Sequence, residues 1–188
     1  MEGILRKEIV VDKNISRIIA VATFVILTAL GAFVRIPLSF TPVPVTLQTF
    51  FVLLSAAFLG ARLGALSQSI YLMLGVAGLP IFTISGSGLL YLLGPTTGYL
   101  FGFILASFLI GRGLRNSNPG FIAVFSLFCM ADLLILACGL IWLKIILGFS
   151  LDKLFLIAVL PFIPGDLIKA YLAAIVYLKF KSRLKEVF

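Results

Sequence analysis

The chain has 188 residues, of which 62% are hydrophobic and only 12% are charged, and its mean hydropathy is +1.23. Because apolar stretches repeatedly reach the length of a bilayer span, this composition excludes a soluble globular domain and predicts an integral membrane protein. The formal net charge is +8, but the cations flank apolar segments and do not form a patch with interleaved aromatic residues, so DNA or RNA binding is not expected.

The hydrophobic pattern predicts one transmembrane domain, residues 1–188, with six membrane-spanning helices. Residues 1–17 carry mixed charges and run directly into the first span, so no cleaved leader is expected. In chain order the expected helices are residues 15–36, 46–61, 63–79, 89–111, 120–147 and 154–179.

The second and third segments are short, and a glycine-flanked turn, residues 60–64, separates them. This turn favours a helical hairpin, with one long kinked helix as the alternative. The fifth segment is long enough to span with tilt or to end in an interfacial stretch at 144–152.

The positions of Lys and Arg predict that both termini lie in the cytoplasm. With this orientation eleven cations fall on the inner side: Arg6, Lys7, Lys13, Arg17, Arg62, Arg112, Arg115, Lys179, Lys181, Arg183 and Lys185. Three fall outside, Arg35, Lys144 and Lys153, while Lys169 lies within the last span. The connections at 37–45, 80–88 and 148–153 are then external.

The external connections differ in composition from the internal ones. Residues 35–48 contain three prolines, which rule out a continuous helix and favour an extended, partly buried loop. Residues 78–88 are rich in small side chains, and Gly94-Pro95-Thr96-Thr97-Gly98-Tyr99 follows shortly after. Because non-helical backbone at membrane depth must face protein or a wet cavity, we expect these segments to line one pocket.

The pair Asp166 and Lys169 is the strongest candidate for ligand contact. Pro164 suits the start of a helix, which places both side chains on roughly one face of its first turn. Ionisable groups within a membrane span are costly and therefore functional by default. An internal ion pair is the structural alternative, but apolar residues could replace such a pair at little cost.

Further polar residues near the outer face are candidate ligand contacts. Thr46 and Gln48 leave the proline-rich loop, although a buried amide can equally satisfy nearby backbone. The other candidates share a hydroxyl group and a position near the outer face: Ser85, Ser87, Tyr91, Thr97 and Tyr99. Each taken alone suits a cap, a turn or an interfacial aromatic, and only their clustering favours a site. Asp132, in the middle of the fifth segment, is a secondary candidate for pairing with Lys169 or an inward Arg, or for a proton route.

No catalytic, metal or cofactor site is expected. The chain has no His, and Cys129 and Cys138 are nine residues apart in apolar sequence, which suits plain packing. Walker, HExxH and serine-elbow motifs are absent from the sequence, so the chain has no energy-transducing site of its own.

Five segments, in order along the chain, resemble BioY, the family of biotin-specific substrate-binding (S) components of energy-coupling factor (ECF) transporters. They are residues 31–37 (GAFVRIP), 44–49 (PVTLQT), 78–82 (GLPIF), 94–100 (GPTTGYL), and 161–166 (PFIPGD) with Lys169. The resemblance spans nearly the whole chain.

The resemblance implies a six-helix S-component fold in the cell membrane and high-affinity capture of biotin from the outer side. It also implies that Asp166 and Lys169 contact biotin, whose ureido ring and carboxylate are held by this pair and by polar groups of the outer loops. The implied partners are a transmembrane coupling (T) component and two ABC-type ATPases. Close helix packing in this family predicts a docking face with small residues on the first helix, here Thr28 and Ala32.

Two other classes of function have less support from the sequence. An ion-coupled carrier working alone would use Asp132 or Asp166 as a titrating group. An intramembrane enzyme would use Asp166 and Lys169 as acid and base, but no metal-ligand cluster and no nucleophile with its base accompany them.

Overall fold

The computed structural model describes residues 13–83, 86–115 and 118–185, and its regular structure is almost entirely helical. The α-helices are α1 (Lys13–Phe33), α2 (Gln48–Val76), α3 (Thr97–Gly113), α4 (Phe121–Leu147), α5 (Leu151–Ala158) and α6 (Ile163–Lys185). A short antiparallel pair, β1 (Arg35–Ile36) and β2 (Val45–Thr46), joins α1 to α2, and a 3-10 helix, η2 (Leu89–Leu93), precedes α3.

By length and composition, described helices α1 and α4 can each cross a membrane, and α2 meets the same criterion when its two halves are counted together. The pair α5 and α6, bent by 48°, makes a fourth when it is counted as one span, and α3 is a shorter apolar helix of 17 residues. The six expected apolar segments correspond to α1, the two halves of α2, α3, α4 and the α5–α6 pair.

Helix α2 is a hairpin of two antiparallel halves, residues 48–59 and 61–76. Gly60 has φ 77° and ψ 179°, a conformation that breaks the helix and that L side chains rarely adopt. The halves pack closely, because a Cβ on Gly64 would lie 2.8 Å from the Ala56 Cα atom. Gln68 Nε2 also donates to Ser55 Oγ at 3.0 Å, a distance that a continuous helix could not allow at this separation in sequence. The hairpin interpretation is therefore confirmed.

Two of the expected helices are interrupted. The segment predicted at 89–111 is split into η2 and α3, because Gly94 is extended and Pro95 lacks a backbone donor. The segment predicted at 154–179 begins earlier, at Leu151, and is broken at 159–162, a stretch that contains Pro161. Helix α4 instead runs unbroken to Leu147, so the stretch after Lys144 begins within a helix.

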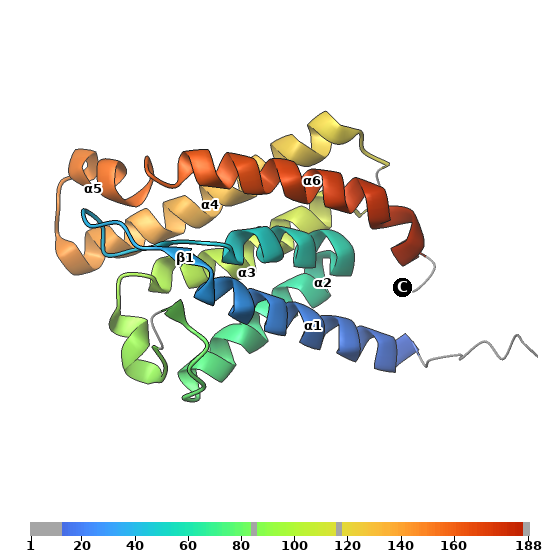
Figure 1. Cartoon of the computed structure of the whole chain (residues 1–188), viewed down its shortest axis with the longest axis horizontal. Helices are drawn as coiled ribbons and strands as arrows, with labels where there is room; N and C mark the ends of the chain where they lie inside the picture. Colours follow the sequence, from blue (N-terminus) through green and yellow to red (C-terminus); the bar gives the residue numbers. More distant parts are fainter. Residues whose placement is uncertain (1–12, 84–85, 116–117, 186–188) are drawn as a thin grey trace, which may run out of the picture.

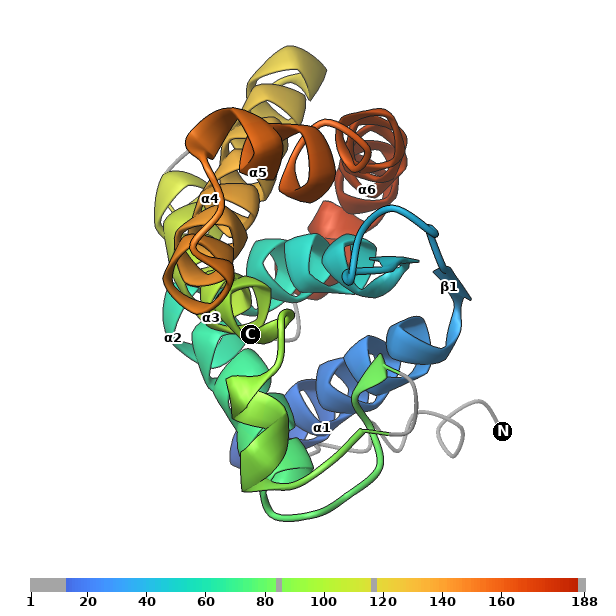
Figure 2. The same ribbon diagram turned by 90° about the vertical axis from the view of Figure 1, so that its left-hand side faces the viewer.

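The helices lie roughly along one axis, and the connections gather at its two ends (Figure 1). The β1–β2 connection, η2 and α5 lie at the left-hand end, here called the loop end. The turn of α2, the end of α3, the start of α4 and the last residues of α6 lie at the right-hand end, here called the basic end. Figure 2 looks at the loop end, where the β1–β2 connection arches from α1 to α2.

Packing against α2 and α4 holds the loop end together. Leu47 N donates to the carbonyl oxygens of Gly31 and Val34, at 3.2 and 3.0 Å, and so ties the start of α2 to the end of α1. The small residues Gly98 and Gly102 bring α3 against α4, where added Cβ atoms would collide with the α4 backbone. The polar side chains of several elements are thereby fixed around one point.

Candidate ligand-binding site

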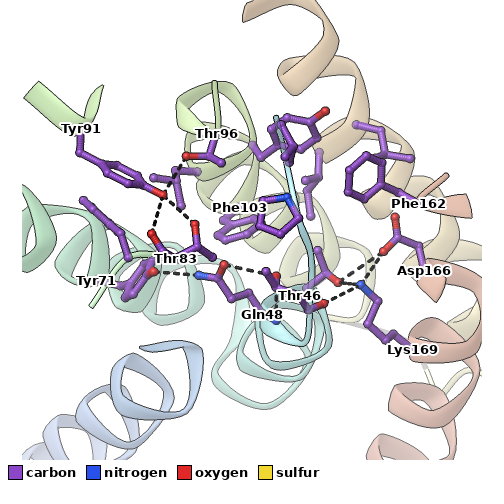
Figure 3. Close-up of a pocket in the computed structure, with 18 residues that line it drawn as sticks. Thr46, Gln48, Tyr71, Thr83, Tyr91, Thr96, Phe103, Phe162, Asp166 and Lys169 are labelled. Atoms are coloured by element: carbon purple, nitrogen blue, oxygen red, sulfur yellow. Dashed lines mark hydrogen bonds and ion pairs between the residues drawn. The ribbon is translucent and has the colours of Figure 1, made fainter. Parts of the chain in front are cut away.

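A narrow internal cavity lies at the loop end, lined by 18 residues (Figure 3). The lining comes from the β1–β2 connection, both halves of α2, the segment before α3, and helices α3, α4 and α6. Its volume is about 50 Å³, which is room for a few water molecules. The segments expected to share one pocket do meet here.

Asp166 and Lys169 form one end of this site, in the first turns of α6. The Lys169 Nζ atom lies 2.6 Å from Asp166 Oδ1, and the two residues are only 8% and 6% exposed. Lys169 also donates to the Thr46 carbonyl oxygen at 3.0 Å and to the Thr49 hydroxyl, which in turn donates to Asp166 at 3.5 Å. This is the only ion pair among the described residues, and β2 and α2 hold it in place.

Gln48 occupies the middle of the site and links the two halves of α2. Its Nε2 atom donates to the Tyr71 hydroxyl at 2.8 Å, and that hydroxyl donates to the Ile81 carbonyl oxygen at 3.0 Å. The Thr46 hydroxyl donates to Gln48 Oε1 at 3.3 Å. Gln48 therefore faces the cavity with its polar atoms already oriented by neighbours.

A cluster of hydroxyl groups forms the opposite end (Figure 3). The Tyr91 hydroxyl lies 2.7 Å from Thr83 Oγ1, and the Thr96 hydroxyl donates to it at 3.1 Å. The Tyr91 ring stacks on Phe82 with centroids 4.5 Å apart, and Phe82 meets Tyr71 edge to face. Aromatic and aliphatic walls thus separate two polar ends, an arrangement typical of small-molecule sites.

Five predicted contact residues line the cavity: Thr46, Gln48, Tyr91, Asp166 and Lys169. Tyr99 lines it as well, with its hydroxyl donating to the Ala158 carbonyl oxygen at 2.8 Å.

Two further predicted contacts, Thr97 and Ser87, do not line the cavity. Thr97 is buried beside it and donates to the Tyr91 carbonyl oxygen at 3.3 Å. Ser87 is half-buried outside the lining. The places of both depend on the backbone around η2 and the start of α3, whose conformation the sequence does not specify. Ser85 lies outside the described residues.

The proposed docking pair on α1 is also placed differently from the prediction. Thr28 and Ala32 are both 0% exposed, and Gln68 Nε2 donates a hydrogen bond to the Thr28 hydroxyl at 3.4 Å. These small residues bring α1 against α2 inside the chain. They present no surface to a partner in this structure.

Sequence reasoning missed several lining residues. Thr49 bridges the ion pair, Tyr71 orients Gln48, and Thr83 and Thr96 hold Tyr91. The position of Thr49 beside Thr46 and Gln48 could have indicated that it contacts the site. Tyr71 carries a weaker indication: it lies about one helical turn after Gln68, a polar residue in an otherwise apolar segment.

Asp132 lies close to the site but outside its lining. It is 4% exposed in α4, and neither carboxylate oxygen has a hydrogen-bond partner in the described part of the chain. It borders an adjacent cavity of about 100 Å³ that shares Asp166 and Leu136 with the first. The expected pairing with Lys169 or an Arg is not formed.

A bundle of apolar helices around a cavity with polar ends defines a multi-pass membrane protein with an internal solute site. The model of the BioY family matches residues 6–186. A probable biotin transporter BioY of Pyrococcus horikoshii is 42% identical over 156 residues, 83% of this chain and 90% of the relative. The biotin transporter BioY of Thermotoga maritima is 40% identical over 167 residues, 88% and 96% of the two chains.

A solved structure shows the same fold. The crystal structure of the S-component for biotin from an ECF-type ABC transporter superimposes with a TM-score of 0.83 at 27% identity, covering 90% of this chain and 93% of that one. The chain belongs to the BioY family.

Proposed function

We propose that this chain is the biotin-binding S component of an ATP-driven vitamin importer of the ECF type. The observation that carries the proposal is the buried Asp166–Lys169 pair on the wall of the cavity, in a chain of a family whose relatives are biotin transporters. It acts in the plasma membrane as a binding and delivery subunit and not as an enzyme, and it needs no bound cofactor.

The ion pair suits the ureido ring of biotin. A cyclic urea presents an N–H donor beside a carbonyl acceptor, and the pair presents a carboxylate acceptor beside an ammonium donor, 2.6 Å apart. A ligand carboxylate at Lys169 would instead lie next to the Asp166 carboxylate, where like charges repel. We therefore place the ureido ring at Asp166 and Lys169.

The valerate carboxylate then extends toward the opposite polar end. Gln48 lies on its way, and the hydroxyls of Thr83, Tyr91 and Thr96 lie at the far end as hydrogen-bond donors. The apolar ring and chain pack against Phe82, Phe103 and Phe162. Selectivity follows because a ligand without matching polar atoms leaves these buried groups unpaired.

Binding requires the cavity to widen. Its volume of about 50 Å³ is far below the roughly 300 Å³ at which ligand pockets begin. Helices α3 and α4 pack closely at Gly98 and Gly102, whereas the wall that carries Thr83, Tyr91 and Thr96 is held by hydrogen bonds of the hydroxyl cluster. Biotin enters when this wall moves away from the ion pair.

The energy for import comes from partners. We propose a T component and two ABC-type ATPases, because the chain has no nucleotide-binding motif and resembles an S-component of an ECF-type ABC transporter. Both termini lie in the cytoplasm and the cavity opens outward. The clustering of Arg62, Arg112 and Lys181 at the basic end supports this orientation.

Calorimetric titration of the purified chain with biotin tests the proposal. Wild type binds tightly, and Asp166→Asn and Lys169→Ala each weaken binding at least ~100-fold, because each leaves a buried partner unpaired. The matched controls are Asp152→Asn and Lys153→Ala, the same changes at exposed positions of α5, which leave binding unchanged.

The outcomes separate function from site. Absence of biotin binding by wild type, with binding of another vitamin, contradicts the substrate. Wild-type affinity in both α6 variants contradicts the site alone. For the partners, uptake by cells expressing all four chains must stop when the ATPases carry inactive Walker motifs; unchanged accumulation would favour a carrier working alone.

A further inference from the structure

A second, larger cavity lies at the basic end, far from the biotin site. Its volume is about 680 Å³, and its walls come from the turn of α2, the end of α3 and the last turns of α6. No residue lines both this cavity and the one at the loop end. It therefore needs an explanation of its own.

Four cations line this cavity: Arg62, Arg112, Arg115 and Lys181. No described carboxylate lies in its lining, and none of the four forms an ion pair within the described residues. Lys181 is oriented by hydrogen bonds, donating to Asn118 Oδ1 at 2.8 Å and to the Pro119 carbonyl oxygen at 3.4 Å. The cavity thus concentrates positive charge that no carboxylate among the described residues neutralises.

The walls below the cations are apolar and fixed in place. The buried Tyr177 ring packs against Phe58 with centroids 5.7 Å apart, and both residues line the cavity. Gly111 of α3 lies directly against the backbone of Gly60 and Ala61, so that an added Cβ would overlap it. The turn of α2 and the end of α3 are therefore locked together, and Arg62 and Arg112 are held near each other.

The positive-inside tendency accounts for the number of cations at this end but not for their convergence. Lys13 and Arg17 of α1 and Lys179 of α6 are exposed at the same end and do not line the cavity. The four cavity cations, by contrast, come from three separate parts of the chain that meet around one hollow.

The cavity also reaches the lipid-facing side of α3. Phe101, Leu105 and Phe108 are each about half exposed and follow one face of the helix, and Phe108 and the exposed Arg112 line the cavity. An apolar stripe that leads into a cluster of cations fits a molecule with acyl chains and an anionic head group.

We propose that this cavity binds the phosphate-bearing head group of an anionic phospholipid of the inner leaflet. Arg62, Arg112 and Arg115 donate to the phosphate oxygens, for which guanidinium groups are well suited, and the acyl chains lie along the exposed stripe of α3. The bound lipid neutralises the cations that converge at the basic end.

Native mass spectrometry of the full-length chain titrated with phosphatidylglycerol and with phosphatidylcholine of the same acyl chains tests this. We expect phosphatidylglycerol to bind at least ~10-fold more tightly, because several cations near one anionic head group add to its attraction. Equal binding of the two lipids by wild type would overturn the proposal without any variant.

Two triple variants with the same change in charge locate the site. R62Q/R112Q/R115Q loses the preference for phosphatidylglycerol, whereas K13Q/R17Q/K179Q keeps it; equal loss in both would mean a diffuse charge effect and refute the site. Biotin binding reports that each variant is folded. R62K/R112K/R115K, which keeps the charge, retains most of the preference. If the triple Gln variant does not fold, R112Q alone provides the test: it should lose part of the preference, and an unchanged preference would refute the site.

Competition distinguishes the sources of the anion. Inorganic phosphate or glycerol 3-phosphate that displaces phosphatidylglycerol at matched concentration would show a site for soluble anions and contradict the lipid assignment. Tighter binding of a soluble Glu-rich peptide than of phosphatidylglycerol would assign the cavity to an acidic protein segment. If neither the small phosphates nor the Glu-rich peptide displaces phosphatidylglycerol, the lipid assignment is supported.

Discussion

At the loop end, the buried charges of Asp166 and Lys169 lie 2.6 Å apart beside a cavity of about 50 Å³, and neighbouring hydroxyl and carbonyl groups are bonded to them. At the basic end, four cations surround a cavity of about 680 Å³, and none is paired with a described carboxylate. The first arrangement is short-range and directional, so it recognises a ligand by exchanging one set of bonds for another. The second acts through net charge, which salt screens and which tolerates a less precise fit.

The largest expected effect tests whether the stability of the loop end depends on the ion pair between Asp166 and Lys169. Lys169→Met leaves Asp166 buried without its cation, close to Asp132, whose carboxylate has no hydrogen-bond partner among the described residues. We expect a loss of about 3–5 kcal/mol in the free energy of unfolding, as for other broken buried pairs. Denaturation of the purified chain in detergent measures it.

The double variant Asp166→Leu/Lys169→Met separates stability from recognition. Removing both charges recovers most of the free energy of unfolding, since an apolar pair can replace a buried ion pair, but biotin binding stays lost. Equal destabilisation of single and double variants would show that the pair is not a coupled unit. Recovery of biotin binding would show that it only supports the fold.

The next effect concerns the middle of the loop-end site. Tyr71→Phe removes the hydroxyl that accepts from Gln48 and donates to the Ile81 carbonyl oxygen, leaving both groups unpaired. The expected cost is about 1–3 kcal/mol in stability, together with weaker biotin binding because Gln48 is no longer oriented. Thermal denaturation and calorimetry measure the two effects. Tyr171→Phe, at a tyrosine that is 49% exposed, is the matched control and changes neither.

The sequence predicts those features of the two regions that depend on local composition and backbone conformation. Apolar length and the Gly60 turn predict the spans and the α2 hairpin, because these depend on local composition and backbone freedom. The place of Asp166 and Lys169 on the cavity wall could be predicted because charged residues inside an apolar helix are rare. The three-proline loop was correctly placed beside them, since extended backbone at that depth has to be covered.

Other parts of the site depend on packing between distant segments, which composition does not encode. The bonds of Thr49 to Asp166 and of Gln48 to Tyr71 connect residues 117 and 23 positions apart, which the tertiary fold brings together. Thr28 and Ala32 show the same limit in reverse: small residues predict close helix approach, but only the structure shows that the neighbour is α2 of the same chain. For the basic end, the sequence predicts only that its cations lie on the cytoplasmic side. That four of them surround one cavity is seen only in the structure.

A smaller effect, of opposite sign, is expected at Asp132. Its carboxylate is buried with no hydrogen-bond partner in the described residues, so a charge there is costly to the folded state. Asp132→Asn keeps the volume and removes the charge, and we expect a gain of about 1 kcal/mol in stability with biotin affinity within twofold of wild type. A fall in transport with unchanged biotin binding would instead place Asp132 on a proton route and weaken the contrast between the two ends.

The smallest effect on stability is expected at the basic end, and it completes the comparison. Arg112→Gln removes one cation, as Lys169→Met does, but from an exposed side chain with no ion-pair partner among the described residues. The free energy of unfolding in neutral detergent should change by less than about 0.5 kcal/mol. In phosphatidylglycerol the wild-type chain should gain thermal stability that Arg112→Gln partly loses, and added salt should reduce this gain because the attraction is screened. A large loss of stability in neutral detergent would mean that Arg112 is already satisfied by the fold, and that the two ends handle charge in the same way.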